Sequence, residues 1–337
     1  MAIHDEGEVI ASRRGYFWVG ADERIQTPFG LTNRGVMYVE WEAPETVTQP
    51  CPIILNHGGG GQGLDYLGTP DGRHGWARQL VQEGWAVYVV DRPGHGRARQ
   101  HPDQLGPLGP PFTYEFASGL FAGGTTGPMA YPPGIESHTQ WPGESPDTGD
   151  RVLDNVLASS GPMLADVKAA HELEQDRLAK LLDLLGPSVL LSHSAGGPAG
   201  FLAAEARPDL IRALVQIEVL GPPFLQRPEM GVSFDWGVSD VPLEYDPPVS
   251  DPAELRDGTP RRLVNLSKFP MALVTSEASV FTQIDPLTYE FLKAHGCDID
   301  YLKLPELGVR GNGHGMMLER NNREALQPIL DWLAKKL

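Results

Sequence analysis

One serine of this sequence occupies the setting that nucleophilic catalysis requires. Residues 188–193 form an apolar run typical of a strand, and Ser194 follows in a turn of small residues that opens a helical pattern. This order is typical of a nucleophile elbow, whose tight turn exposes the serine hydroxyl and needs small residues two positions before and after it. Those positions hold Ser192, where glycine is more usual, and Gly196. We therefore expect Ser194 to be a nucleophile; the alternative is a serine that caps the helix.

A serine nucleophile needs a base, and His314 is the histidine that the chain order favours. It stands in the glycine-flanked loop 311–315, after the predicted strand 299–304 and before a final amphipathic helix. Where the serine elbow comes first in sequence, the acid and then the histidine follow it, the histidine after the last strand. The alternative is an ordinary surface-loop histidine. The other histidines fall outside this order: His4, His57, His74, His95, His101, His138, His171, His193 and His295.

Two carboxylates are candidates for the acid that fixes the tautomer of the base and stabilises the imidazolium. Glu218 ends a predicted strand that follows the elbow helix, and Glu277 ends the next predicted strand. The acid most often lies just beyond this second strand, but the chain has Ser279 there. That favours Glu218, which apolar neighbours would bury, so that it would need a specific partner. Glu277 stays open as the alternative.

The oxyanion that forms on an attacked carbonyl needs preorganised N–H donors. The backbone N–H of Ala195, directly after the nucleophile, is one expected donor. The second should come from the glycine run 58–61, which follows the predicted strand 52–56 and whose backbone can approach a substrate closely. We expect Gly59 to supply it, with Gly60 as the alternative. The run lacks the Lys-Ser/Thr ending of a phosphate-binding loop.

These residues need a scaffold of strands and helices. Short apolar runs alternate with helical patterns, which is typical of parallel strands joined by crossover helices. Segments 14–20 and 35–41 predict an antiparallel pair at one edge of the sheet. We expect an α/β fold with a mostly parallel central sheet flanked by helices. The predicted parallel strands are 52–56, 86–91, 188–193, 213–219, 271–276 and 299–304, and the predicted helices lie near 75–83, 162–185, 195–206, 285–295 and 322–336.

Two segments, at about 101–150 and 220–265, break this alternation. Both are rich in Pro and Gly, which excludes central strands and helix interiors over much of their length. Disorder is the alternative for such segments. We expect a single domain over 1–337, in which the two segments are lid-like insertions over the site. Aromatic residues favour an ordered, apolar lid in the first segment: Tyr114, Phe116, Phe121, Tyr131 and Trp141.

The charge balance argues against polyanionic partners. The 337 residues include 27 Lys and Arg against 44 Asp and Glu, and the formal charge of −17 would repel nucleic acid and anionic membranes. No apolar run approaches the ~20 residues of a membrane span, and the N-terminal sequence lacks a secretory pattern. We expect a small-molecule substrate and a cytoplasmic protein. Secretion after removal of a signal peptide is the alternative location, and a homodimer is left open.

Neither a cofactor nor a metal is expected, since backbone N–H groups would stabilise the developing charge and no cluster of ligands stands out. Cys51 and Cys297 show no CxxC or Cys/His spacing, so we expect two buried thiols. A disulfide between them is the alternative.

Four motifs, namely 69–76, the turn at Asp91, the elbow of Ser194 with Glu218, and 311–322, together resemble those of the bacterial esterase 713 family, an α/β-hydrolase family. The resemblance implies the α/β-hydrolase fold, esterase activity and a glutamate as the acid of the triad. The namesake of the family has adjacent cysteines where this chain has Gly59-Gly60, so any role of a disulfide there is absent.

The sequence thus predicts a serine hydrolase that cleaves a carboxylic ester of a small, largely apolar substrate through an acyl-enzyme. Hydrolysis of a lactone, of an imide or amide, or of a carbon–carbon bond by the same triad is the main alternative. A binder of small molecules without catalytic activity is a further one, which an intact serine, glutamate and histidine set disfavours.

Overall fold

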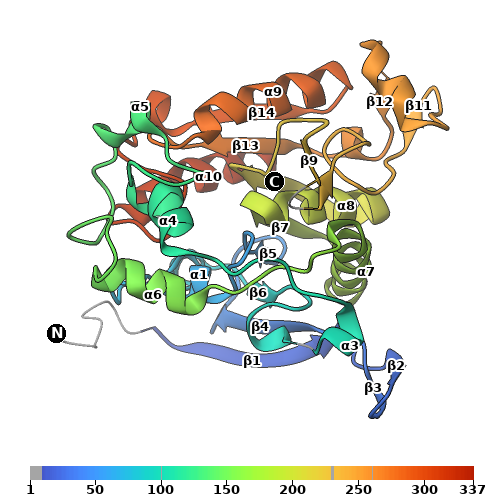
Figure 1. Cartoon of the computed structure of the whole chain (residues 1–337), viewed down its shortest axis with the longest axis horizontal. Helices are drawn as coiled ribbons and strands as arrows, with labels where there is room; N and C mark the ends of the chain where they lie inside the picture. The colour runs from blue at the N-terminus through green and yellow to red at the C-terminus, as the bar shows by residue number, and fades with distance from the viewer. Residues whose placement is uncertain (1–9, 100, 229–230, 260) are drawn as a thin grey trace.

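The structure, a computed structural model, describes residues 10–99, 101–228, 231–259 and 261–337. Its centre is an eight-stranded sheet in the order β1-β4-β6-β5-β7-β8-β13-β14 (Figure 1). From β6 to β14 the neighbouring strands are parallel, whereas β4 is antiparallel to both β1 and β6. The prediction of a mostly parallel sheet with an antiparallel pair at one edge is confirmed. Residues 1–9, part of the N-terminal stretch in which no secretory pattern was found, lie outside the described residues.

The parallel strands are short and apolar because helices cover the sheet on both faces. Every residue of β5 and β7 is buried. The strands are β1 (Ser12–Val19), β4 (Met37–Pro44), β5 (Ile53–Asn56), β6 (Val87–Asp91), β7 (Ser188–His193), β8 (Ile211–Ile217), β13 (Met271–Thr275) and β14 (Ile299–Lys303). The helices on the sheet are α2 (Trp76–Gln82), α7 (Val167–Leu185), α8 (Gly197–Ala206), α9 (Phe281–Ala294) and α10 (Asn322–Lys336).

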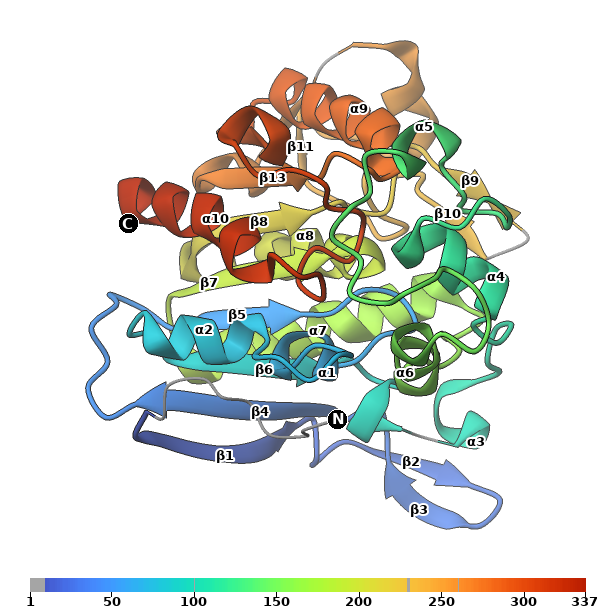
Figure 2. The ribbon, with the colours of Figure 1, turned by 90° about the vertical axis from the view of Figure 1, so that its left-hand side faces the viewer.

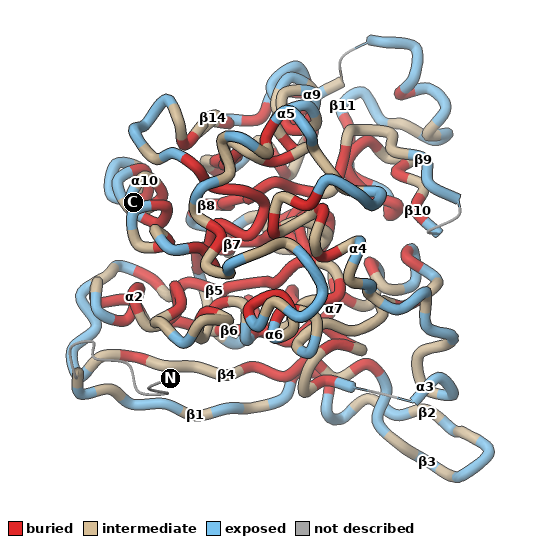
Figure 3. The backbone as a smooth tube through the Cα atoms, turned by 60° about the vertical axis from the view of Figure 1, so that its left-hand side comes forward, coloured by how far each residue is buried: buried red, intermediate tan, exposed pale blue. Residues whose placement is uncertain are grey.

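Alternate residues of the strands face two separate apolar layers. On β7, Val189 and Leu191 pack in the layer of α2 and α10, whereas Leu190 packs in the layer of α7 and α8. In Figure 2, α2 and α10 lie in front of the sheet. Figure 3 shows the buried backbone gathered in the central strands between these layers. The sheet is therefore a rigid platform, and a fully buried Val or Leu in it contributes about 1.5–3 kcal/mol to stability.

The carboxyl ends of the parallel strands meet at one edge of this platform, where open α/β sheets place their sites. Strand β5 ends at Asn56, β7 at His193 and β8 at Ile217. The glycine run follows β5, Ser194 follows β7, and Glu218 follows β8. Three candidate groups from distant parts of the sequence therefore emerge side by side.

The two segments that break the alternation contain small elements. Segment 101–150 is followed directly by a helix that the sequence did not predict separately, α6 (Arg151–Ser159), which begins where Asp150 accepts from two N–H groups of its first turn. Segment 101–150 contains α3 (Pro102–Leu105), α4 (Tyr114–Ala117) and α5 (Pro132–Ile135), and segment 220–265 contains β9 (Gln226–Arg227), β10 (Val232–Ser233), β11 (Tyr245–Asp246) and β12 (Arg262–Leu263). Elsewhere, α1 (Leu64–Leu67) follows the glycine run, and β2 (Arg24–Thr27) and β3 (Gly30–Asn33) form a hairpin.

Candidate active site

Ser194 lies at the tip of a tight turn between β7 and α8. Its φ of +53° is in the left-handed region that residues with a side chain seldom adopt. Two residues later only glycine fits, because a Cβ on Gly196 would lie 2.2 Å from the carbonyl oxygen of His57. Two residues earlier, Ser192 fits and its hydroxyl accepts a hydrogen bond from Asn56 Nδ2 at 3.3 Å. The turn thus has the strained geometry of a nucleophile elbow.

The hydroxyl of Ser194 begins a chain of hydrogen bonds that leads into the protein. Its Oγ lies 2.9 Å from Nε2 of His314, whose Nδ1 lies 2.7 Å from Oε2 of Glu218. Both His314 and Glu218 are buried. An ionised carboxylate only accepts hydrogen bonds, so Nδ1 of His314 donates to it and the lone pair of Nε2 faces the serine. In this tautomer the hydroxyl donates to the imidazole, as a nucleophile does to its base.

Glu218 is held by donors other than the histidine. Its φ is +41°, directly after the end of β8, which turns the side chain toward the next strand. Its Oε1 accepts from the backbone N–H and the hydroxyl of Ser276, at 2.8 and 2.5 Å. These two donors offset the burial of a charged group and leave Oε2 for the imidazole.

The other candidate acid, Glu277, lies elsewhere. Its carboxylate accepts from the guanidinium of Arg310 at 2.8 Å and from the backbone N–H of Gly311 at 2.9 Å. It therefore fastens the start of the loop that carries His314, whereas the ring of His314 donates its hydrogen bond to Glu218.

The glycine run packs directly on the elbow. A Cβ on Gly59 would lie 2.9 Å from Cβ of Ala195 and 2.8 Å from Sδ of Met163. The chain then turns away at Gly60, where φ is +69° and a Cβ would meet the ring of Phe112 at 2.9 Å. Gly59 is thus the member of the run that adjoins Ala195, and its role as the second oxyanion donor stays a prediction.

A buried ion pair contacts the first residue of this glycine run. Arg92 donates to the carbonyl oxygen of Gly58 at 2.8 Å and to Glu174 at 2.8 Å. His57 accepts the backbone N–H of Arg92 at its Nε2 and donates from Nδ1 to the same carbonyl of Gly58. Burial lowers the pKa of His57 well below its ordinary value, so the ring is neutral, as an accepting Nε2 requires. Sequence patterns did not identify these supports, because they come from three separate elements.

The ring of His314 is enclosed by other rings. Phe281 stacks on it with centroids 4.5 Å apart and planes at 11°, and Phe121 of segment 101–150 lies at 5.7 Å. His193, which the chain order excluded as a base, lies at 4.4 Å, and its Nε2 is 3.0 Å from the carbonyl oxygen of His314. Burial lowers the pKa of His193 well below its ordinary value, so it is neutral and donates this hydrogen bond. His193 thus holds the backbone of His314, a role that the sequence analysis missed.

A cavity of about 480 Å³ opens at Ser194. Much of its wall is apolar, and among the described lining residues Asp65 is the only carboxylate. Segment 101–150 supplies three large side chains to the wall: Phe112, Leu120 and Phe121. The described part of segment 220–265 supplies none. Most of its buried side chains pack in the layer of α7 and α8, and Val232 and Phe234 form a separate cluster with Val167.

The described residues contain no group of three or more His, Cys, Asp or Glu side chains placed to hold a metal ion. In the same ranges no helix is both long and apolar enough to cross a membrane. Cys51 and Cys297 are buried and unpaired, as the first of the two sequence interpretations proposed.

Comparison with known proteins places this geometry in context. The profile of the alpha/beta hydrolase fold family matches residues 52–286. A protein of a fungus (Fungal sp. strain ATCC 74256), named "Probable secreted lipase phiG", is 33% identical over 351 residues, covering 98% of this chain and 92% of the relative. Among solved structures, a bacterial esterase superposes with a TM-score of 0.72 and 24% identity over 99% of each chain, a likeness of fold.

Proposed function

The chain belongs to the α/β-hydrolase fold family and is a hydrolase of the lipase and esterase type, and we propose that it cleaves carboxylic esters through an acyl-enzyme on Ser194. The observation that carries this proposal is the hydrogen-bond chain from Ser194 through His314 to Glu218 at the wall of a cavity. The relative named as a lipase favours an ester over the lactone, imide, amide and carbon–carbon substrates that the same groups could attack.

The proposed reaction uses each group of the site in turn. Ser194 Oγ attacks the ester carbonyl carbon while its proton passes to Nε2 of His314, and Glu218 stabilises the resulting imidazolium. The carbonyl oxygen becomes an oxyanion, which accepts hydrogen bonds from the N–H groups of Gly59 and Ala195. The intermediate collapses as His314 protonates the departing alcohol, and the acyl group stays on the serine. Water then attacks the acyl carbon while the same histidine takes its proton. The bond from that carbon to Oγ breaks, the histidine returns the proton to Ser194, and the carboxylic acid leaves.

The enclosure of the His314 ring suits this proton transfer. Phe281 and Phe121 keep bulk water from two sides of the imidazole, so the charge that forms on it is stabilised mainly by Glu218 and by ring contacts. In a medium of low effective dielectric constant, the attraction between imidazolium and carboxylate is stronger than in water.

We further propose that the substrate is small and largely apolar and that segment 101–150 is a lid-like cover over it. Three of its large apolar side chains line the cavity, whose volume of about 480 Å³ lies in the range of small-molecule sites. Phe121 would contact both the substrate and the ring of His314.

The cellular location of the protein is a separate question. The expectation from the sequence was the cytoplasm, with secretion as the alternative. We propose secretion, because the fungal relative is named as a secreted lipase. Esterase activity in the culture medium of the source organism, compared with its cell extract, tests this.

Labelling with a fluorophosphonate probe tests the nucleophile. We expect the probe to modify Ser194 in the wild-type protein, and Ser194→Ala to lose both labelling and hydrolysis of p-nitrophenyl acetate. Ser192→Gly is the matched control, because this neighbour is buried and the change restores the more usual elbow residue. Labelling of another residue, or full activity of Ser194→Ala, would show that the proposed mechanism is wrong.

A further inference from the structure

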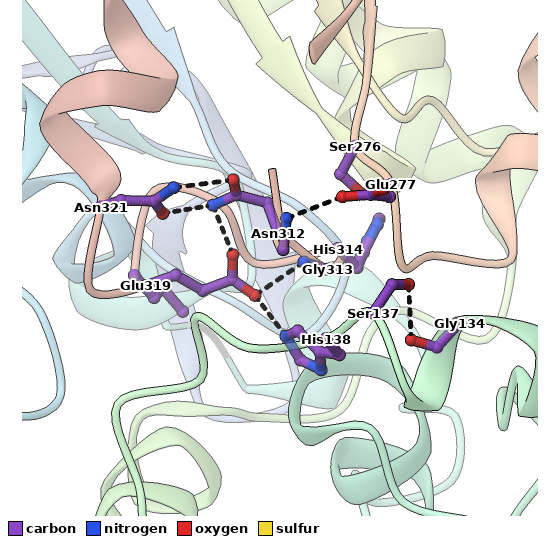
Figure 4. A network of polar contacts seen from close by, with 12 residues as sticks. Gly134, Ser137, His138, Ser276, Glu277, Asn312, Gly313, His314, Glu319 and Asn321 are labelled. Atoms are coloured by element: carbon purple, nitrogen blue, oxygen red, sulfur yellow. Dashed lines mark hydrogen bonds and ion pairs between the residues drawn. The ribbon is translucent and has the colours of Figure 1, made fainter. Parts of the chain in front are cut away.

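A buried carboxylate that the proposed reaction does not use lies beside the loop of His314. Glu319 is fully buried and accepts three hydrogen bonds (Figure 4). Its Oε1 accepts from the backbone N–H of Gly313 at 2.9 Å and from Nε2 of His138 at 2.6 Å, and its Oε2 accepts from Nδ2 of Asn312 at 2.7 Å. We call these four residues the Glu319 cluster. Two of the three donors belong to the residues directly before His314.

No Lys or Arg forms an ion pair with Glu319 in the described part of the chain. A buried carboxylate without a cation is held by its N–H donors, so the donors are held by it in turn. Asn312 is fixed further by a reciprocal amide pair with Asn321, at 2.6 and 3.0 Å. Its amide therefore has one orientation, with its nitrogen toward Glu319.

The third donor, His138, comes from segment 101–150. Its side chain is buried and its Nδ1 has no hydrogen-bond partner among the described residues, so the one hydrogen bond of the ring is the one that Nε2 donates to Glu319. The neighbouring backbone is joined to the same loop, because the N–H groups of Thr139 and Gln140 both donate to the carbonyl oxygen of Gly311, at 3.0 and 3.1 Å. Residues 138–140 are thus fixed beside the loop of His314 by both side chain and backbone.

The loop needs such support because three of its five residues, 311–315, are glycine. Glycine gives a backbone many accessible conformations, whereas Nε2 of His314 must stay within hydrogen-bond reach of Ser194. Glycine at position 313 also allows His138 and Glu319 to approach the backbone closely. A Cβ there would lie 2.8 Å from Nε2 of His138 and 3.2 Å from Oε1 of Glu319.

We propose that Glu319 and His138 are positioning residues that hold the loop of His314 in its reactive place, so that segment 101–150 is part of the catalytic framework as well as a cover. The inference rests on the proposed function. It implies that residues 138–140 stay fixed to the loop, and that any opening of the lid involves the part of segment 101–150 before His138.

The test compares His138→Ala, which removes the donor, with His138→Gln, whose amide nitrogen can replace Nε2. We expect His138→Ala to lower kcat for p-nitrophenyl acetate by on the order of 10- to 100-fold with little change in KM, because the base is misplaced while the cavity is intact. The rate of fluorophosphonate labelling should fall in parallel. His138→Gln should recover most of the wild-type kcat, which a loss of packing alone would not predict.

His295→Ala is the control for removing a buried ring. His295 is buried at the end of α9, where it packs on Phe291 with centroids 4.1 Å apart, and it does not line the cavity. This variant should lower the Tm and leave kcat near the wild-type value. If His138→Ala does not fold, Glu319→Gln serves instead, because its amide would place donors against Gly313 or Asn312 and should lower kcat in the same way.

Each outcome decides one question. A folded His138→Ala with the wild-type kcat, a His138→Gln as slow as His138→Ala, or a loss confined to KM would overturn the positioning role. Absence of labelling of Ser194 in the wild-type protein would instead overturn the proposed function. Wild-type labelling together with equally fast labelling of His138→Ala would refute the positioning role alone.

Discussion

Replacing Glu218 by glutamine should inactivate the base without disturbing the fold. Ser276 donates its N–H and its hydroxyl to Oε1 of the carboxylate, so a glutamine will turn its carbonyl oxygen to Ser276. Its NH₂ group then faces Nδ1 of His314, where the carboxylate had accepted at 2.7 Å. The imidazole must present a lone pair to that donor, which moves its proton to Nε2. In that tautomer it cannot accept the proton of Ser194.

The size of the loss follows from this exchange of tautomers. In serine enzymes of another fold, the same acid-to-amide change lowers kcat by about 10⁴-fold with the geometry intact. Four factors of ten correspond to about 5.5 kcal/mol of transition-state stabilisation. We expect a loss of this order for Glu218→Gln, because the donors from Ser276 leave the amide no other favourable orientation.

The assay is hydrolysis of p-nitrophenyl acetate, with active sites counted by fluorophosphonate labelling and folding checked by Tm. Glu277→Gln is the matched control: it has the same change of charge one residue from Ser276, but its carboxylate contacts Arg310 and Gly311 instead of the imidazole. It should keep activity within about tenfold of the wild type, since it acts only on the loop. Retention of a tenth or more of the wild-type kcat by Glu218→Gln, or an equal loss in Glu277→Gln, would refute the assignment of the acid.

Three further predictions concern other parts of the molecule. Gly59→Ala should lower kcat by on the order of 100-fold with little change in KM, because the added Cβ presses on Ala195 and would displace an oxyanion donor; unchanged steady-state kinetics would point to another donor. Burial raises the pKa of Asp65 from 3.8 to about 7, so the ionised carboxylate is less favourable in the folded protein than in the unfolded chain. The free energy of unfolding therefore falls as the pH rises from about 4 to 7, and it falls no further from this cause at higher pH. Asp65→Asn should therefore stabilise the protein by roughly 1–2 kcal/mol at pH 8 and by much less at pH 4. This figure is reduced because the side chain of Asp65 is partly exposed to solvent. Equal changes in Tm at the two pH values would contradict the prediction. Burial also raises the pKa of both Cys51 and Cys297, that of Cys297 to about 12. Neither thiol should therefore react with a disulfide reagent until the protein is unfolded. A rapid reaction in the folded state would show that one of the thiols is accessible.

The local patterns predicted those parts of the site that depend on short stretches of chain. The elbow of Ser194 is a strand, a turn and a helix in one continuous segment, so its pattern can be recognised from that segment alone. His314 and Glu218 were selected by their order along the chain and by the strands before them, and the structure brings both to Ser194. The choice between Glu218 and Glu277 remained open because both follow neighbouring parallel strands. The folded chain gives them different partners: Glu218 meets His314, and Glu277 meets Arg310.

The supports of the site were not predictable, because they join elements that are distant in sequence. His138 and Glu319 are 181 residues apart, and His193 was set aside although it holds the backbone of His314. A lone histidine in a loop gives no pattern that distinguishes a free side chain from a buried donor, since burial depends on which segments fold over it.

The sequence by itself determined the alternation of strands and helices and predicted Ser194 as the nucleophile, because hydrophobic period and tight turns are encoded within about ten to twenty residues. The tertiary structure decided which carboxylate meets His314, which glycine adjoins Ala195 and how segment 101–150 is fastened to the loop of His314. Those outcomes depend on distances between separate elements, and such distances are set only when the two apolar layers close on the sheet.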